Sequence, residues 1–266
     1  MGFHSPADGG HAFDPDVLDS YSLKVGGAAV SYPQGHIVPM HQHRSGHLVY
    51  ADRGLLRVET ENGRWLVPPT SAVWLRPGVP HRLIAPVALQ AFGLFVSEEA
   101  SRDLPSTDCV VQVSDLLRAL IIRLTSLGHP AAPSRTGHLL GELLIEELRT
   151  PPPLPLHLPW PQDEKIKLVC DTLMADPSHE NTADQWASAV ALGVKTFHRH
   201  FLKSTGITFG RWRQRLRLMS SLTLLTQEAS ITEAALASGY DSHSAYTHAF
   251  KKQFGVPPSA FARAGR

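Results

Sequence analysis

Residues 230–261 read SITEAALASGYDSHSAYTHAFKKQFGVPPSAF, and this stretch decides the fold at the end of the chain. Its pattern predicts a short helix at 231–238, a turn at Gly239-Tyr240-Asp241 and a longer helix at 243–254. Pro257-Pro258 then ends the unit, because proline cannot continue a helix. Two helices joined by a short turn are typical of a helix-turn-helix unit.

The longer helix has two chemically different faces. Tyr246, Phe250 and Phe254 recur every four residues, so they share the buried face. The outer face then carries the polar side chains of His243, Ser244, Thr247 and His248. Polar groups on the exposed side of the second helix are the arrangement with which such a unit contacts DNA bases.

A related unit comes earlier in the chain. After a helix at 163–174, Thr182 is placed to cap a short helix, and a break at 191–193 precedes the helical stretch KTFHRHFLKS. Phe197 and Phe201 are four residues apart and are expected to be buried together. The outward cations and histidine suit phosphate oxygens and guanine: Lys195, His198, Arg199 and Lys203.

A long helix over about 210–225 connects the two units.

Charge is distributed unevenly along the chain, although its formal net charge is only +1. Residues 163–266 hold 13 Lys and Arg against nine Asp and Glu, whereas residues 1–162 hold 12 against 15. A basic second part behind an acidic first part indicates that only the second part meets phosphates.

The text over 195–225 and 230–261 strongly resembles the DNA-binding region of the AraC/XylS family of bacterial transcription regulators. The resemblance implies two reading helices about 34 Å apart that enter successive major grooves of double-stranded DNA. It implies base contacts from Lys195, His198 and Arg199, and from His243, Ser244, Thr247 and His248. It also implies RNA polymerase as a partner, and activation more often than repression. The chain departs from the family pattern at Ala191 and Gly193, and in having no arginine on the second outer face.

The first part of the chain reads differently. Short apolar and β-branched runs from about Ser22 to Val96 alternate with Gly, Pro and Asn, which predicts a β-sandwich or barrel. Glu61-Asn62-Gly63 predicts a hairpin, because Asn-Gly tolerates positive φ angles. Amphipathic helices are expected at 114–127 and 134–148, either covering the barrel or pairing with a second subunit. The Pro-rich segment TPPPLPLHLPWPQ predicts an extended linker without paired strands.

Histidines mark a possible ligand site in the predicted barrel. Gly35, His41, His43, His47 and Gly54 have the spacing of the first cupin motif, and WLRPGVPHRL, with Gly78 and His81, resembles the second. Histidines two apart on a strand point to the same side. His41, His43, His47 and His81 could therefore hold one divalent transition metal, such as Zn, Ni, Fe or Mn. The alternative is a metal-free barrel whose histidines line the pocket of a small-molecule effector.

Taken together, we expect a multi-domain α and β chain with an N-terminal cupin β-barrel and helices (1–150), a linker (151–162) and a C-terminal all-α domain with two helix-turn-helix units (163–266). The expected function is sequence-specific transcription regulation, controlled by a small molecule or metal. The alternative is a metal-dependent cupin enzyme fused to a DNA-binding domain; no general acid or base near the motif supports it. Two cysteines, no signal peptide and no apolar span favour a cytoplasmic protein, with a homodimer possible.

Overall fold

A computed structural model describes residues 24–127, 134–149, 153–154, 156–227 and 229–264. The chain divides into two compact units. The first holds residues 1–60 and 65–154, and the second holds residues 61–64 and 155–266. Within the described ranges, no helix is both long enough and apolar enough to cross a bilayer.

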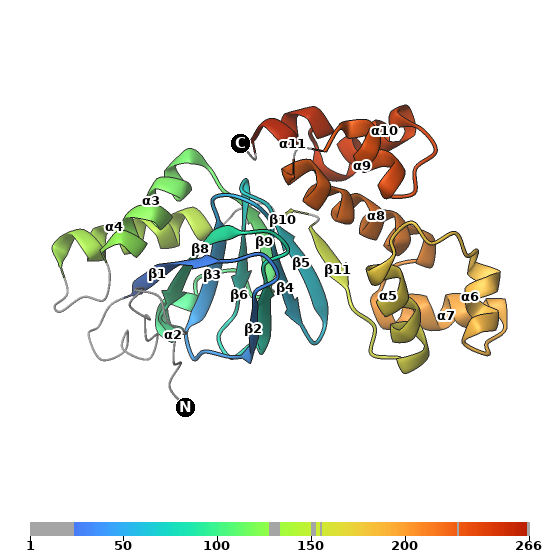
Figure 1. The fold of residues 1–266 in the computed structure, drawn as a ribbon. Coiled ribbons are helices and arrows are strands. Elements are labelled where there is room, and N and C mark those ends of the chain that lie inside the picture. Colours follow the sequence, from blue (N-terminus) through green and yellow to red (C-terminus); the bar gives the residue numbers. More distant parts are fainter. Residues whose placement is uncertain (1–23, 128–133, 150–152, 155, 228, 265–266) are drawn as a thin grey trace. The chain divides into compact units, whose positions relative to one another are not determined.

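The strands form two antiparallel sheets (Figure 1). The six-stranded sheet has the order β1-β8-β3-β6-β9-β10, and the five-stranded sheet has the order β11-β5-β4-β7-β2. Their bounds are β1 Val25–Tyr32, β2 Ile37–His41, β3 Gly46–Ala51, β4 Leu56–Thr60, β5 Gly63–Val67, β6 Ser71–Leu75, β7 His81–Ile84, β8 Leu89–Val96, β9 Cys109–Gln112, β10 Pro153–Leu154 and β11 His157–Pro159. The predicted β-architecture is confirmed, and β9 extends it beyond the expected range.

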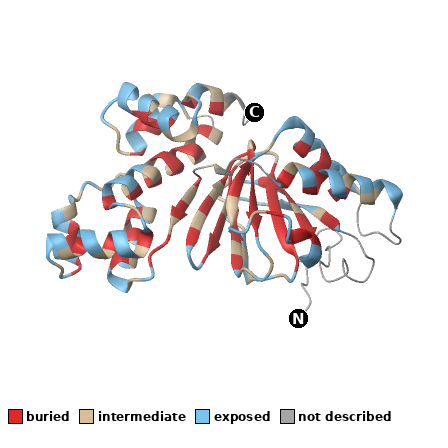
Figure 2. Cartoon of the chain, turned by 180° about the vertical axis from the view of Figure 1, so that it is seen from behind, coloured by how far each residue is buried: buried red, intermediate tan, exposed pale blue. Residues whose placement is uncertain are grey.

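Two amphipathic helices cover one face of the six-stranded sheet. α3 (Asp115–Ser126) and α4 (Arg135–Leu148) bury leucines against Leu48, Trp74 and Leu94. A short helix, α2 (Glu98–Ser101), directly follows β8. Figure 2 shows the buried side of α3 and α4 turned toward the strands. Of the two roles expected for these helices, the structure therefore shows the one in which they cover the barrel.

Two local expectations need correction. The hairpin lies where predicted, between Thr60 and Gly63, but neither Asn62 nor Gly63 has a positive φ. The Pro-rich segment does form paired strands, because β10 and β11 each lie at the edge of a sheet. Proline is tolerated there: Pro153 begins β10 and Pro159 ends β11, so little of the sheet's hydrogen bonding is lost.

The second unit is built from helices, as predicted. Its helices are α5 Glu164–Ala175, α6 Ala183–Ala189, α7 Val194–Thr205, α8 Phe209–Thr226, α9 Ile231–Ala237, α10 His243–Phe254 and α11 Pro258–Ala264. Complete capping boxes start α6 and α9, with Thr182 and Ser230 as the capping residues. These caps fix where the first helix of each helix-turn-helix unit begins.

Candidate functional site

The first candidate reading helix, α7, separates an aromatic face from a charged face. Phe197 and Phe201 are fully buried, with their ring centroids 5.8 Å apart. Lys195, His198 and Arg199 are exposed on the other side, as predicted, and so is Lys203. Their placement leaves the cations of α7 accessible to a ligand from outside.

One residue on this exposed face was missed by the sequence analysis. Leu202 is 48% exposed, although leucine is usually buried. It lies seven residues after Lys195 and therefore on the same stripe of the helix. An apolar side chain in this position suits the methyl group of thymine. The helical spacing from Lys195 was the signal that could have identified it.

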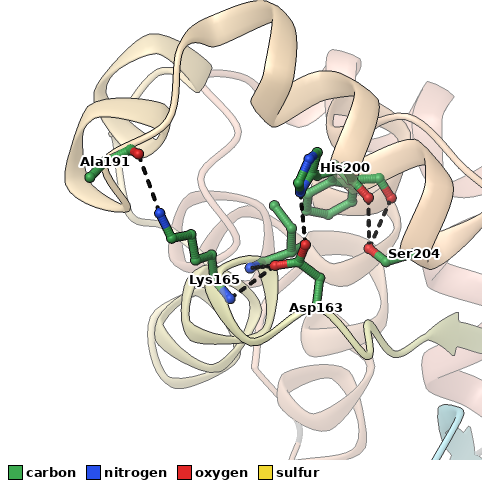
Figure 3. A network of polar contacts seen from close by, with 7 residues as sticks. Asp163, Lys165, Ala191, His200 and Ser204 are labelled. Carbon is green, nitrogen blue, oxygen red and sulfur yellow. Dashed lines mark hydrogen bonds and ion pairs between the residues drawn. The ribbon is translucent and has the colours of Figure 1, made fainter.

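A network of polar contacts holds α7 against the start of α5 (Figure 3). The Nδ1 atom of His200 lies 2.8 Å from Oδ2 of Asp163, the residue that also caps α5. Nζ of Lys165 donates to the carbonyl of Ala191 at 3.3 Å, in the turn before α7. Burial alone would raise the pKa of the Asp163 carboxyl, but bonds from His200 and two backbone amides lower it overall. The network therefore fixes both the middle of α7 and the turn that precedes it.

The turn between α6 and α7 departs from the usual residues, as the sequence suggested. Ala191 has φ of 51°, the only positive φ of a non-glycine residue in the described part of the chain. Gly193 caps α7 without a side-chain hydrogen bond. The helix still starts at the expected place, because glycine at this position costs only a few tenths of a kcal/mol relative to a capping side chain.

The second candidate reading helix, α10, has the same two-faced construction. Tyr246 and Phe250 are fully buried, and His243, Ser244 and His248 are exposed. Thr247 differs from the expectation: it is half-buried, and its hydroxyl has no hydrogen-bond partner among the described residues. Its side chain must therefore rotate before that hydroxyl can meet a base.

The outer stripe of α10 also contains a cation that the sequence analysis missed. Lys251 is exposed and follows Ser244 by seven residues, so it lies on the same side of the helix. A lysine there suits a phosphate oxygen, although the second face has no arginine.

One long helix supports both reading helices. The Phe201 and Trp212 ring centroids are 5.8 Å apart, which links α7 to α8. The Tyr246 hydroxyl donates to Oγ of Ser221 at 2.8 Å, which links α10 to α8. Because both contacts are buried, α8 acts as a common scaffold for the two units.

Three of the four predicted histidines in the barrel come together at one point. His41, His43 and His81 each offer a ring nitrogen, and these atoms all lie within 4.8 Å of one another. Nδ1 of His41 lies 2.7 Å from the Pro39 carbonyl, and Nδ1 of His81 lies 2.8 Å from the Val79 carbonyl. A carbonyl only accepts, so each Nδ1 carries the hydrogen and each Nε2 carries a lone pair. Such backbone contacts orient imidazoles toward a metal.

The fourth histidine occupies a different position. His47 comes from β3 in the six-stranded sheet, whereas His41 and His81 come from the five-stranded sheet. Its ring is buried and stacks on Phe95 with a centroid distance of 4.4 Å. Its Nδ1 lies 3.1 Å from Nε2 of His81. The structure thus places His47 beside His81 and His43, with their ring centroids each 5.2 Å from that of His47, but outside the group of three ring nitrogens.

Burial keeps the four imidazoles neutral. It lowers the pKa of His43, next to His41, and the pKa of His81 to about 4 each. Burial also lowers the pKa of His41, and it lowers that of His47 well below its usual range. Neutral imidazole is the form that binds a metal ion, so the cluster is competent to do so at neutral pH.

Comparison with known proteins identifies both parts of the chain. Residues 27–148 match the model of the AraC-like ligand binding domain, and residues 186–264 match a helix-turn-helix domain. The transcriptional regulator NimR of Escherichia coli K12 is 32% identical over 223 residues, or 84% of this chain and 81% of NimR. The chain belongs to the AraC family of transcription regulators. This AraC-family regulator therefore combines a ligand-binding domain with a DNA-binding domain.

Two further comparisons cover different shares of the regulator. RipA of Corynebacterium glutamicum is 31% identical over 122 residues, which is 46% of this chain and 35% of RipA. The solved structure of ToxT from Vibrio cholerae covers 91% of this chain and all of that chain, with a TM-score of 0.40 and 11% identity. That likeness is too low to support an argument. NimR and RipA are both named as transcriptional regulators, in agreement with the family of this chain.

The stability of the regulator without metal should depend on pH. The pKa of His43 and of His81 is about 4 in the folded chain, against an ordinary value of 6.5. Between these values the unfolded chain binds more protons, so stability falls as the pH falls from about 6.5 to about 4. We expect a lower urea midpoint at pH 5 than at pH 7 in the presence of a chelator. A double His43→Gln and His81→Gln variant should reduce this difference; an equal pH dependence in both proteins would contradict the assignment.

Proposed function

We propose that the regulator reads a specific duplex with the outer faces of α7 and α10, which enter successive major grooves. The observation that carries this proposal is that α7 and α10 each have an exposed polar stripe. On the opposite side of each helix, a buried aromatic stripe packs against the common scaffold α8. The base-contacting residues are Lys195, His198, Arg199 and Leu202 on α7, and His243, Ser244 and His248 on α10, with Lys203 and Lys251 at phosphates. Thr247 contributes after its side chain rotates.

Arg199→Ala tests this proposal on α7. An arginine that bonds a guanine edge contributes about 1–3 kcal/mol of discrimination, so the variant should bind its selected duplex about 5- to 150-fold more weakly. Affinity would be measured by fluorescence anisotropy on a duplex selected by the wild type from a random library. Arg211→Ala, at an exposed position on α8, is the matched control. Equal affinity of Arg199→Ala and wild type would remove Arg199 from the reading set.

Control by the barrel is the second part of the proposal. His41, His43 and His81 would hold one divalent transition metal ion, and Zn, Ni, Fe and Mn all accept imidazole ligands. An ion at Nε2 of His81 would replace the present contact with His47, which then becomes a neighbouring group or a fourth ligand. A small-molecule effector in the same barrel is the alternative occupant. Either controls DNA binding only if its affinity differs between two arrangements of the protein.

We also propose that the regulator activates transcription in the cytoplasm by contacting RNA polymerase. RhaS of Escherichia coli O139:H28, which is named a transcriptional activator, is 34% identical over 76 residues, or 28% of this chain and 27% of RhaS. Transcription in vitro from a promoter that carries the selected duplex tests this part. Added protein should increase the transcript, and a decrease would make the protein a repressor.

A homodimer through α4 is the last part of the proposal. Leu139 and Leu143 are 56% and 42% exposed, on the side of α4 opposite its buried face. In an antiparallel pair centred near Gly141, Leu139 of one copy meets Leu143 of the other, and Arg135 meets Glu147. Such charge pairing fixes the register of helices.

Light scattering tests the dimer directly. Wild type should have twice the mass of a variant that carries both Leu139→Glu and Leu143→Glu, because buried carboxylates oppose the apolar contact. Leu116→Glu, at an exposed leucine on α3, should remain dimeric. A monomeric wild type would contradict the proposal.

A further inference from the structure

Arg217, on the scaffold helix α8, bonds to segments from both helix-turn-helix units. Its Nε donates to the Pro177 carbonyl at 3.0 Å, and its Nη2 donates to the Ser178 carbonyl at 3.4 Å. Its Nη1 donates to the Gly239 carbonyl at 3.0 Å. One guanidinium group thus joins the backbone oxygens of two segments, 177–178 and 239, that lie far apart in the sequence.

The three carbonyls lie just before elements that carry the reading helices. Pro177 and Ser178 belong to the loop between α5 and α6, and α6 packs on α7. Gly239 belongs to the turn between α9 and α10. Arg217 is therefore bonded to the supports of the first and the second reading helix at once.

The turn at Gly239 is shaped to receive this guanidinium. Gly239 has φ of +74°, a conformation that other residues rarely adopt. A Cβ atom at this position would lie 2.8 Å from Cζ of Arg217, which is closer than real Cβ contacts come. Glycine thus serves both the turn and the close approach of Arg217.

A neighbouring arginine provides an internal comparison. Arg213, one turn earlier on α8, donates to the Asn181 carbonyl at 2.8 Å and to the carbonyl of His179. Both oxygens belong to the loop before α6. Arg213 therefore secures only the first helix-turn-helix unit to α8, whereas Arg217 bonds to segments of both helix-turn-helix units.

We propose that Arg217 is a positioning residue that fixes the separation and relative orientation of α7 and α10, and so sets which spacing of DNA half-sites the regulator accepts. The planar guanidinium offers donors in a fixed fork, so three carbonyls are held in one geometry. A lysine in its place keeps the charge but offers a single mobile ammonium. This inference rests on the proposed reading of two grooves.

The first test measures the separation without DNA. Spin labels at Leu202→Cys on α7 and Lys252→Cys on α10, both exposed positions, report a distance distribution by pulsed electron resonance. Cys109→Ser and Cys170→Ala remove the native thiols. We expect a broader distribution in Arg217→Lys than in wild type or in Arg213→Lys. Arg217→Gln is the second variant, and circular dichroism confirms that each variant is folded.

The second test measures the spacing preference on DNA. Two base pairs inserted between the half-sites of a duplex selected by wild type turn the second groove away by about 70°. Loss of hydrogen bonds from a charged donor should lower the discrimination against this insertion about tenfold in Arg217→Lys, with little change in Arg213→Lys. Binding to a single half-site should be the same in all three proteins.

The two tests distinguish a failure of the positioning role of Arg217 from a failure of the reading of two grooves. An unchanged distance distribution in Arg217→Lys and Arg217→Gln overturns the role of Arg217, whatever the DNA result. A broader distribution together with a wild type that tolerates the insertion upholds the role of Arg217 and contradicts the reading of two grooves.

Discussion

Phe201→Ala is expected to destabilise the second unit by about 3–5 kcal/mol, because the change removes a fully buried aromatic ring and leaves a cavity. The Phe201 ring centroid lies 5.2 Å from that of Phe209 and 5.8 Å from that of Trp212. The lost contacts are therefore those that join α7 to the scaffold. Urea unfolding followed by circular dichroism measures the change.

A neighbouring position on the same helix gives the control for this prediction. Leu202→Ala should change the free energy of unfolding by no more than about 0.5 kcal/mol, because about half of Leu202 is already exposed to solvent. DNA affinity should follow the opposite order once the fraction of folded protein is taken into account. Leu202→Ala should then bind more weakly than Phe201→Ala, because Leu202 is the residue proposed to contact a base. Equal stabilities of Phe201→Ala and Leu202→Ala would show that α7 is not packed as described.

His81→Ala should weaken binding of Zn²⁺ or Ni²⁺ by about 100-fold or more, if the histidine cluster holds a metal. Replacing a residue that only hydrogen-bonds to a metal-coordinating side chain lowers metal affinity about 10- to 100-fold. Removing a coordinating side chain itself should lower the affinity at least as much. The same loss is expected for His41→Ala and His43→Ala, since the three ring nitrogens lie within 4.8 Å of one another. Competition with a chelating dye measures the affinity.

Comparing the metal affinities of several histidine variants tests the cluster more strictly than any single affinity does. His47→Ala should have a smaller effect, because His47 is not one of the three histidines whose ring nitrogens lie within 4.8 Å of one another. His36→Ala is the control, since His36 stacks on Tyr32 outside the cluster. Wild-type metal affinity in His81→Ala would leave a small-molecule effector as the occupant of the barrel.

The sequence predicted most of the second unit because its signals are local. Aromatic residues four apart marked the buried faces of α7 and α10, and the turn at Gly239 separated α9 from α10. The faces of these helices follow from a fixed helical period. Lys251 and Leu202 were missed because neither residue type is distinctive, although the same period places both on the outer stripes.

Contacts between distant segments could not be predicted in the same way. The motif grouped His47 with the other three histidines, but only the pairing of strands reveals that His47 approaches them from the opposite sheet. Nothing in the sequence indicated which carbonyls Arg217 bonds. Likewise, proline content alone gave no sign that 153–154 and 157–159 would find places at sheet edges.

Hydroxyl-radical footprinting of the full chain on its selected duplex tests the central claim most directly. If α7 and α10 read successive major grooves, the regulator protects two windows about 10 base pairs apart on one face of the duplex. Arg199→Ala should weaken protection in one window, and His248→Ala should weaken it in the other. A single protected window, or loss of the same window in both variants, would contradict the claim.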